Sequence, residues 1–474
     1  MKKNKLFTQT GKRVLTITLI AAMSVSVFGG CGKKASDKNE NGQTVIKVGG
    51  WPSQEGGQLT AMNERKEKFE NDNPDFVIEP DLWSFDLKSF YSKAAGNTLP
   101  TIFNCYFTEM PQIRDMEYSK ELTKAFKDNG FEGKFNPKIL EAVSDEDGNI
   151  YGLPYSAYML GLTYNVDLFE KAGLMEADGT PKQPKTWDEV VEFAKIIKEK
   201  TGKPGMVFPS MTNFGGWMFM PIAWSYGVDF MEQDEDGNWK ATFNSPQATA
   251  ALQYIKDLKW KHNVLPDNTL IDGTEYYKMY CTGQAGMLIS ATGITNNARQ
   301  YGMNPEHVGM MAMPAGPECH VTLLGGNVYC IANNSTDDQT DGALKWIKMS
   351  TTYEASEDFK NSLNKSIENS KKNNQVIGLK SLSIWNDNTE SVKLNNEMIE
   401  NNANINLNHV RLYNEFLESD VKIQPEEPVC AQELYAVLDN CIQEVWTNEN
   451  ADCTEVLKKA NADFQSNYLD NIDY

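Results

Sequence analysis

Two hydrophobic periods alternate along the first hundred residues. Residues 44–50, TVIKVGG, form a β-branched run that ends in glycines and predict a first strand. The next stretch, GQLTAMNERKEKF, places Leu59, Met62 and Phe69 at helical spacing. A second strand is expected around Phe76–Glu79, a helix over DLKSFYSKAAG, and a third strand over LPTIFNCYF. Strands that alternate with helices in this way predict a parallel α/β sheet.

The middle and the end of the chain predict amphipathic helices. In PKTWDEVVEFAKIIKEKTG, Thr186 is placed as an N-cap, with Glu189 three residues later. Another helix is expected over 247–260. The segment 432–469 is expected to be helical, with a break near 448–452.

Two segments, which begin at Asp145 and Asp234, share the sequence DEDGN. An EF-hand calcium loop needs Glu at its twelfth position, and these segments have Pro154 and Phe243 there. Asp-Gly ahead of a strand-like run is typical of a hairpin turn, so two turns are predicted instead.

The N-terminus has the parts of an export signal. The first thirteen residues carry five cations and no acid, and residues 14–30 are uncharged and end in FGG before Cys31. Seventeen residues that include threonines, serines and glycines make a poor membrane span. Residues 1–30 are therefore interpreted as a signal peptide. Two readings of Cys31 stay open, a lipidation site or an incidental cysteine, and we favour the first because the polar stretch that follows, 31–43, suits a flexible tether.

Composition narrows the class of protein. A chain of 474 residues is long enough for two domains. Removal of residues 1–30 would leave 40 basic residues against 65 acidic ones. Nucleic acid binding needs clustered positive charge, so we expect no nucleic acid partner.

Cysteine and histidine usage gives no sign of a metal site. Seven cysteines follow Cys31, with no CxxC spacing, and the four histidines are scattered. Cys319 and Cys330 could pair across a hairpin, but buried free thiols are the favoured interpretation. We expect no metal and no cofactor.

The order of several segments resembles a known family. The segments are TVIKVGGW, AAGNTLPTIF, YGLPYSAYMLGLTYNVDLFEKAGL, PKTWDEVVEFAKIIKE, NSPQATAALQYIKDL, TGQAGMLISATG, MPAGP and GGNVYCIANNST. Together they resemble the extracellular solute-binding proteins of bacterial ABC importers, in the group that captures sugars and oligosaccharides. One departure is Thr101, where this family often has Asp.

The resemblance implies a fold of the type II periplasmic-binding-protein kind, with two α/β lobes around a ligand cleft. The first lobe is expected to combine residues 44–155 with 315–380, and the second to combine 156–314 with 381–474. The crossings between lobes are expected at 155–162, near 308–314 and around 377–385. The implied protein is not an enzyme but a monomer that binds a carbohydrate, delivers it to permease subunits, and is anchored by lipid on the outer face of the cell membrane.

Loops that follow strands supply the candidate ligand residues, because ligands lie beyond the carboxyl ends of parallel strands. Sugars present C–H faces that suit aromatic rings and hydroxyls that suit carboxylates and amides. With the family resemblance as a guide to position, the expected site residues are Trp51, Gln54, Trp83, Asp86, Tyr106, Glu109, Tyr155, Trp217, Thr292, Gly293 and Asn327.

The other tryptophans lie mostly within predicted helices. Trp187, Trp260, Trp346 and Trp446 are expected in the core, and Trp224 and Trp385 are left undecided.

Two alternatives stay open at this point. A polyamine or other non-sugar solute also suits carboxylates with aromatic rings. A surface glycoside hydrolase needs only two carboxylates beside a cleft, although the chain has no GxSxG or HExxH motif.

Overall fold

The computed structural model describes residues 37–472, and the predicted signal peptide and Cys31 lie outside this range. Residues 38–43 form a turn that leads into the first strand, with the backbone N–H of Asn39 donating to the carbonyl of Gln43 over 2.9 Å.

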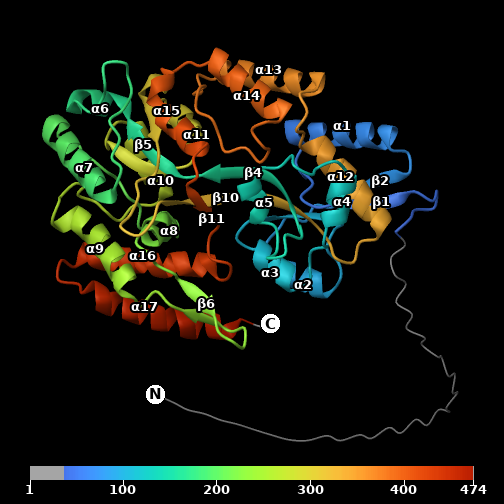
Figure 1. Ribbon diagram of the computed structural model, residues 1–474, viewed down its shortest axis with the longest axis horizontal. Coiled ribbons are helices and arrows are strands. Elements are labelled where there is room, and N and C mark those ends of the chain that lie inside the picture. Colours follow the sequence, from blue (N-terminus) through green and yellow to red (C-terminus); the bar gives the residue numbers. More distant parts are fainter. Residues whose placement is uncertain (1–36, 473–474) are drawn as a thin grey trace, which may run out of the picture. The chain divides into compact units, whose positions relative to one another are not determined.

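The described residues contain eleven strands and seventeen α-helices, joined by loops and short 3-10 turns (Figure 1). The strands are β1 (Thr44–Val48), β2 (Phe76–Pro80), β3 (Ile102–Tyr106), β4 (Leu153–Met159), β5 (Gly161–Asn165), β6 (Met231–Gln233), β7 (Trp239–Ala241), β8 (Met287–Ser290), β9 (Val308–Met311), β10 (Val321–Ile331) and β11 (Lys422–Gln424). The helices are α1 (Gly57–Asp72), α2 (Leu87–Ala95), α3 (Met110–Asp115), α4 (Thr123–Asp128), α5 (Pro137–Glu141), α6 (Val166–Ala172), α7 (Trp187–Thr201), α8 (Phe214–Ser225), α9 (Pro246–Trp260), α10 (Gly273–Cys281), α11 (Ile294–Gln300), α12 (Asp337–Ser350), α13 (Glu357–Lys372), α14 (Glu390–Asn401), α15 (Arg411–Leu417), α16 (Ala431–Thr447) and α17 (Cys453–Asn467).

One sheet has six strands. Its order is β11-β10-β3-β1-β2, and β4 also pairs with β10. Strand β1 is parallel to β2 and to β3, as the sequence predicts, whereas β10 is antiparallel to β3 and β4. In the view of Figure 1, α1 lies above these strands and α2 and α3 lie below them.

A second sheet has three strands, in the order β8-β5-β9, and its pairings are antiparallel. The chain passes between the two sheets at Leu160, which separates β4 from β5, and again over 312–320, which separate β9 from β10. Ser381 lies in the segment expected to cross a third time, and its hydroxyl lies 2.9 Å from that of Thr292.

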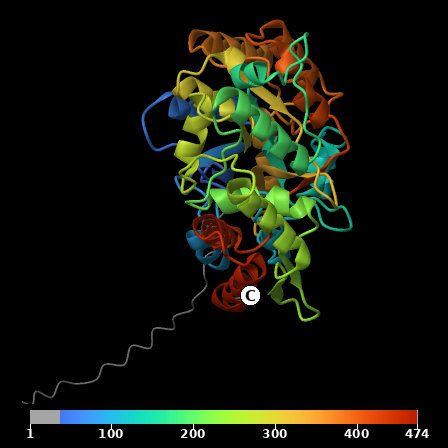
Figure 2. The ribbon, with the colours of Figure 1, turned by 90° about the vertical axis from the view of Figure 1, so that its left-hand side faces the viewer.

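The N-cap and the apolar face that predicted the helix after Thr186 are both present in α7. Thr186 caps α7 by accepting the backbone N–H of Glu189, and Val190, Ala194 and Ile197 face the core. The terminal segment forms α16 and α17, with the predicted break between them. These two helices lie side by side (Figures 1 and 2).

The two DEDGN segments are turns, as predicted. Asp145 accepts the backbone N–H groups of Asp147 and Asn149, and the second segment joins β6 to β7. Both turns place a glycine at positive φ, Gly148 at 81° and Gly237 at 83°, which glycine adopts without strain. Among the described residues, no group of three or more His, Cys, Asp or Glu side chains is arranged to hold a metal ion.

The cysteines of the described residues are free thiols. The pairing of Cys319 with Cys330 is wrong, because Cys319 is exposed while Cys330 is buried in β10. Two sulfur atoms lie 3.5 Å from Cys330 Sγ, namely Sγ of Cys105 on the neighbouring strand β3 and Sδ of Met110.

Three of the four tryptophans predicted for the core are buried there, namely Trp187, Trp346 and Trp446. The prediction for Trp260 is wrong, since its side chain is 37% exposed. Trp260 is the last residue of α9, where its ring covers the edge of α16 and its indole N–H donates to the carbonyl of Val445. The two undecided tryptophans, Trp224 and Trp385, are also buried.

Candidate ligand-binding pocket

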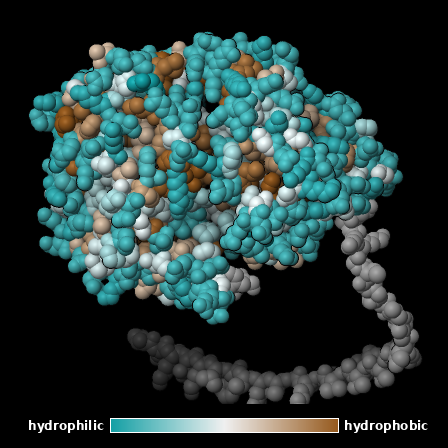
Figure 3. All heavy atoms as spheres, viewed as in Figure 1, coloured by the Kyte–Doolittle hydropathy of each residue, from teal (hydrophilic) through white to brown (hydrophobic). Residues whose placement is uncertain are grey.

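A pocket of about 540 Å³ lies between the loops of the six-stranded sheet and helices α8 and α16. Its size suits a small organic ligand. On the face drawn in Figure 3, most residues are hydrophilic, and the hydrophobic residues appear in several separate groups, some of them near the middle of that face. The lining residues are Phe85, Asp86, Leu87, Tyr106, Thr108, Glu109, Tyr158, Thr212, Asn213, Phe214, Trp217, Gly326, Glu426, Gln432 and Tyr435.

Four predicted site residues meet in this pocket. They are Asp86, Tyr106, Glu109 and Trp217. Asp86 caps α2 by accepting the backbone N–H of Ser89, and Tyr106 ends β3 with 51% of its side chain exposed. The loops that follow β2 and β3 therefore do bring predicted residues to the pocket, and the ligand role of these residues stays a prediction.

The other seven predicted residues do not line the pocket. Trp51 is only 4% exposed, and its ring stacks on Trp346 at a centroid distance of 6.0 Å. Gln54 is exposed, and the indole N–H of Trp83 donates to the hydroxyl of Ser89 over 2.9 Å. The ring of Trp51 therefore packs against α12, and the ring of Trp83 is bonded to α2, so neither ring faces the pocket.

The remaining four lie along β4, β10 and the start of α11. Tyr155 stacks on Tyr329 at 4.1 Å, and burial raises the pKa of Tyr155 to about 12. Asn327 donates from Nδ2 to the hydroxyl of Ser156 over 2.9 Å. Thr292 contacts the crossing segment, and Gly293 precedes α11.

Glu426 was missed by the sequence analysis and sits at the centre of the pocket's hydrogen bonds. Its Oε1 accepts the indole N–H of Trp217 over 2.8 Å, and its Oε2 accepts the hydroxyl of Thr108 over 2.7 Å. Glu426 therefore links α8 to the loop that follows β3. Burial raises the pKa of Glu426, while the hydrogen bonds from Thr108 and Trp217 act in the opposite direction.

Glu109 lines the same pocket as Glu426, but one of its carboxyl oxygens has no hydrogen-bond partner. Its Oε2 is buried and has no hydrogen-bond partner. Burial, followed by the charge of Glu426, raises the pKa of Glu109 to about 7. A buried oxygen without a partner is costly unless a ligand or a proton satisfies it.

The start of α8 is held in an unusual conformation. Thr212 and Asn213 have φ values of 58° and 67°, a left-handed region that costs energy for residues other than glycine. The carboxylate of Asp439 on α16 accepts the backbone N–H groups of Asn213, over 2.7 Å, and Gly216, over 2.8 Å. These bonds place a carboxylate at a helix N-terminus, where it is favourable.

Glycines set the spacing behind the pocket. A Cβ at Gly216 would lie 2.3 Å from the carbonyl oxygen of Tyr435, so α8 and α16 can approach only because of this glycine. A Cβ at Gly325 would overlap the ring of Tyr158 on β4. The glycine pairs in NFGGW and LLGGN signal close approaches of the chain, but only the tertiary structure shows that the partners are Tyr435 and Tyr158.

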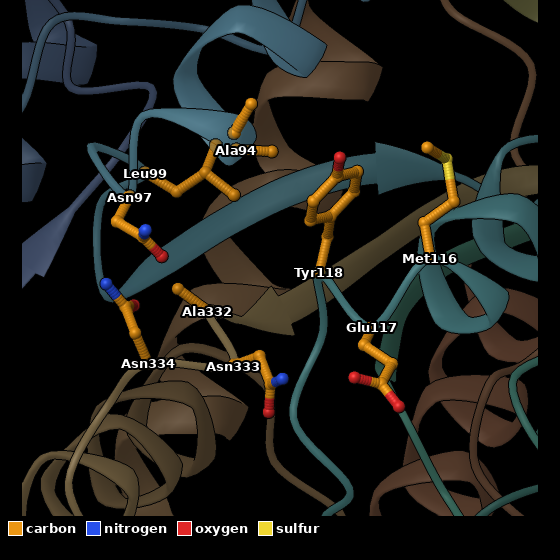
Figure 4. Close-up of a pocket in the computed structure, with 10 residues that line it drawn as sticks. Ala94, Asn97, Leu99, Met116, Glu117, Tyr118, Ala332, Asn333 and Asn334 are labelled. Carbon is orange, nitrogen blue, oxygen red and sulfur yellow. The ribbon is translucent and has the colours of Figure 1, made fainter. Parts of the chain in front are cut away.

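A second pocket, of about 320 Å³, lies at the ends of α2 and α3 (Figure 4). The amides of Asn97 and Asn334 face each other on one side of it, and Tyr118 stands on the other. The Tyr118 ring packs against Phe90 at 5.8 Å, so the wall of this pocket is the edge of the core. None of the predicted site residues lines it.

The family model described as bacterial extracellular solute-binding protein matches residues 33–357. The chain belongs to this family. Its members bind solutes and are not enzymes, so the hydrolase alternative is wrong.

Among curated relatives of this solute-binding protein is the sn-glycerol-3-phosphate-binding periplasmic protein UgpB of Escherichia coli K12. The two are 26% identical over 322 residues, which cover 65% of this chain and 70% of the relative.

Solved structures show the fold. Maltose-bound MalE3 of T. maritima matches with a TM-score of 0.61 at 23% identity, over 89% of this chain and 99% of its own. The cyclic alpha-maltosyl-1,6-maltose binding protein of Arthrobacter globiformis matches with 0.63 at 21% identity, over 90% and 99%. UgpB of Mycobacterium tuberculosis in complex with glycerophosphocholine also matches with 0.63, at 16% identity, over 90% and 98%. This solute-binding protein thus has the type II periplasmic-binding-protein fold.

Among the described residues of this solute-binding protein, no helix has the length and apolar character that a membrane crossing needs. Any attachment to the membrane through Cys31 would depend on residues outside the described range.

Proposed function

We propose that this protein is the lipid-anchored component of an ABC importer that captures a carbohydrate in the 540 Å³ pocket. The observation that carries the proposal is the lining: six aromatic residues stand beside carboxyl, amide and hydroxyl groups. Rings suit the C–H faces of a sugar, and the polar groups suit its hydroxyls. The solved relatives described with maltose and with a cyclic maltosyl-maltose support the same class of ligand.

Capture occurs by closure of two lobes, residues 44–155 with 315–380 and residues 156–314 with 381–474. The pocket lining supports this division, because Tyr106 and Glu109 come from the first set of residues, and Trp217 and Glu426 from the second. A ligand that contacts both sets favours the closed state by its differential affinity. The closed form then delivers the sugar to the permease.

A panel of oligosaccharides tests the ligand class. Thermal unfolding and calorimetry of the purified chain should show binding to at least one sugar. At a ligand concentration of about 100 times Kd, the gain in folding free energy should be about 2.7 kcal/mol. At the same ligand concentration, Trp217→Ala should reduce this gain to about 1 kcal/mol or less, whereas Trp260→Ala, which changes a tryptophan outside the pocket, should preserve it. A panel without any hit would refute the carbohydrate proposal.

The anchor has its own test. Cys31 is the proposed site of acylation after cleavage at the Gly30–Cys31 bond. Cys31→Ala should move the protein from the membrane fraction to the soluble fraction and remove labelling by a fatty-acid probe. A variant that stays in the membrane fraction would contradict the anchor while leaving the ligand class untouched.

A further inference from the structure

The charged side chains that line the pocket are all carboxylic acids. Its three ionisable carboxyl groups are Asp86, Glu109 and Glu426, and none of its fifteen lining residues is Lys, Arg or His. Other carboxylates of this chain commonly pair with lysine, as Asp167 does with Lys171 over 2.6 Å. Within residues 37–472, none of the three pocket carboxyls forms such an ion pair with a side chain of the protein.

The carboxylate of Glu109 lies in an unfavourable environment. Burial, and then the charge of Glu426, raises the pKa of Glu109, and Glu109 Oε2 is a buried acceptor without a donor. A positive group placed beside both would supply the missing donor and relieve the repulsion between the two carboxylates.

The aromatic residues at the mouth of the pocket suit the same charge. Phe85 and Tyr106 meet edge to face at 6.0 Å, and Phe214 and Trp217 meet in the same way at 5.2 Å. The faces of such rings attract cations as well as sugar C–H groups. Thr212, Asn213 and Gln432 add neutral polar side chains, which suit the hydroxyls of a sugar and have no counterpart on a simple linear polyamine.

We propose that the ligand is an amino sugar or an oligosaccharide of amino sugars, whose protonated amine is held by Glu109 and Glu426. This inference rests on the proposed carbohydrate function and specifies its substrate class. The amine donates to Glu109 Oε2 and lies within the field of Glu426, while the sugar rings contact the aromatic side chains.

Calorimetry with matched ligands tests the inference at pH 7, near the pKa of Glu109, because at lower pH this carboxyl is mostly protonated and has no charge to attract the amine. The probes are oligosaccharides of glucosamine and the N-acetylated oligosaccharides of equal length, which lack the charge but keep the ring. The amine form should bind at least 10-fold more tightly, and this preference should shrink as salt is added.

Paired variants locate the charge. Glu109→Gln keeps the shape of the side chain and should reduce the preference for the amine form to less than 3-fold. Glu427→Gln is the matched control. Glu427 is next to Glu426 in the sequence and is buried, but it lies outside the pocket lining. Its side chain accepts the indole N–H of Trp224, and the amide oxygen of glutamine can still do so. The control should keep the full preference, and circular dichroism should show that both variants are folded.

The outcomes separate the inference from the function on which it rests. Equal or tighter binding of the N-acetylated or of neutral glucose oligosaccharides would overturn the amino-sugar assignment and leave the carbohydrate function standing. Binding of spermidine with no binding of any sugar would overturn both. A preference that Glu109→Gln leaves intact would also overturn the assignment.

Discussion

The pocket has two walls that differ in how their polar groups are satisfied. The first wall consists of 85–87, Tyr106 and 108–109, from loops of the six-stranded sheet; the second consists of 212–217 and 426–435, from α8, α16 and the segment before α16. Most polar groups of the second wall, such as those of Asn213 and Trp217, bond to the protein itself, whereas the hydroxyl of Tyr435 is buried without a partner. In the first wall, the Oε2 atom of Glu109 has no partner. We infer that the bonded groups of the second wall support the pocket, and that Glu109 and Tyr435 keep hydrogen-bonding capacity for the ligand.

The largest expected effect is a loss of folding stability when Asp439, which holds the start of α8 in the second wall, is replaced. Asp439→Ala would leave the backbone N–H groups of Asn213 and Gly216 without their acceptor and release the strained start of α8. Loss of two charge-assisted hydrogen bonds should lower the free energy of unfolding by about 3–5 kcal/mol. Urea unfolding measures it, with Asp439→Asn as a partial replacement. A loss below about 1 kcal/mol would mean that the second wall is not held in this way.

The next effect concerns ligand affinity. Trp217→Ala removes a ring from the second wall. It also removes one of the two hydrogen-bond donors to Glu426, so that only Thr108 remains. Sugar affinity should fall by about 2 kcal/mol or more, roughly 30-fold, as for buried aromatic contacts at binding sites. Trp260→Ala should change affinity less than 3-fold. Titration calorimetry compares the two, and similar losses would show that the effect is not local to the pocket.

The third effect is a pH dependence that belongs to the first wall. The folded-state pKa of Glu109 is about 7, above the value of 4.5 for an unperturbed glutamate, so the folded chain binds more protons between these values. Its contribution to stability is therefore full below pH 4.5 and is lost as pH rises through 7. Glu109 in turn contributes to the raised pKa values of Tyr91 and Cys105, and both of these groups stay protonated over this range because burial raises the pKa of each.

Glu109→Gln should abolish this loss. From pH 4.5 to 8, the free energy of unfolding of the unmodified chain should fall relative to that of the variant by about 3 kcal/mol. The difference between the two chains is the informative quantity, because burial also raises the pKa of Glu427 to about 7 in both. Parallel stability curves for the two chains would show that Glu109 does not titrate in this window.

The sequence predicted the first wall better than the second. Asp86, Tyr106 and Glu109 follow strands whose order could be read from hydrophobic periods, and parallel strands bring such loops to one edge. Trp51 follows a strand by the same rule, but its ring packs on Trp346, almost 300 residues away in the chain. Local pattern cannot distinguish a ring that covers a helix from a ring that faces a ligand.

The second wall depends on pairings that no short window contains. Glu426 reaches the pocket because β11 pairs with β10, and Tyr435 does so because α16 packs on α8 at Gly216. A Pro-Glu-Glu-Pro segment reads locally as an exposed loop. Glu427, the second glutamate of this segment, is buried beside Trp224, and only the tertiary arrangement separates its role from that of Glu426.

The position of Glu426 along the chain has a consequence for biosynthesis. Strands β1, β2 and β3 and helix α8 are all translated, and exported, before the segment that carries this carboxylate. Until nine-tenths of the polypeptide has emerged, Trp217 and Thr108 lack their shared acceptor and the pocket has only one complete wall. We therefore expect a chain that is truncated before Glu426 to lack part of one wall and to lose the proposed solute binding.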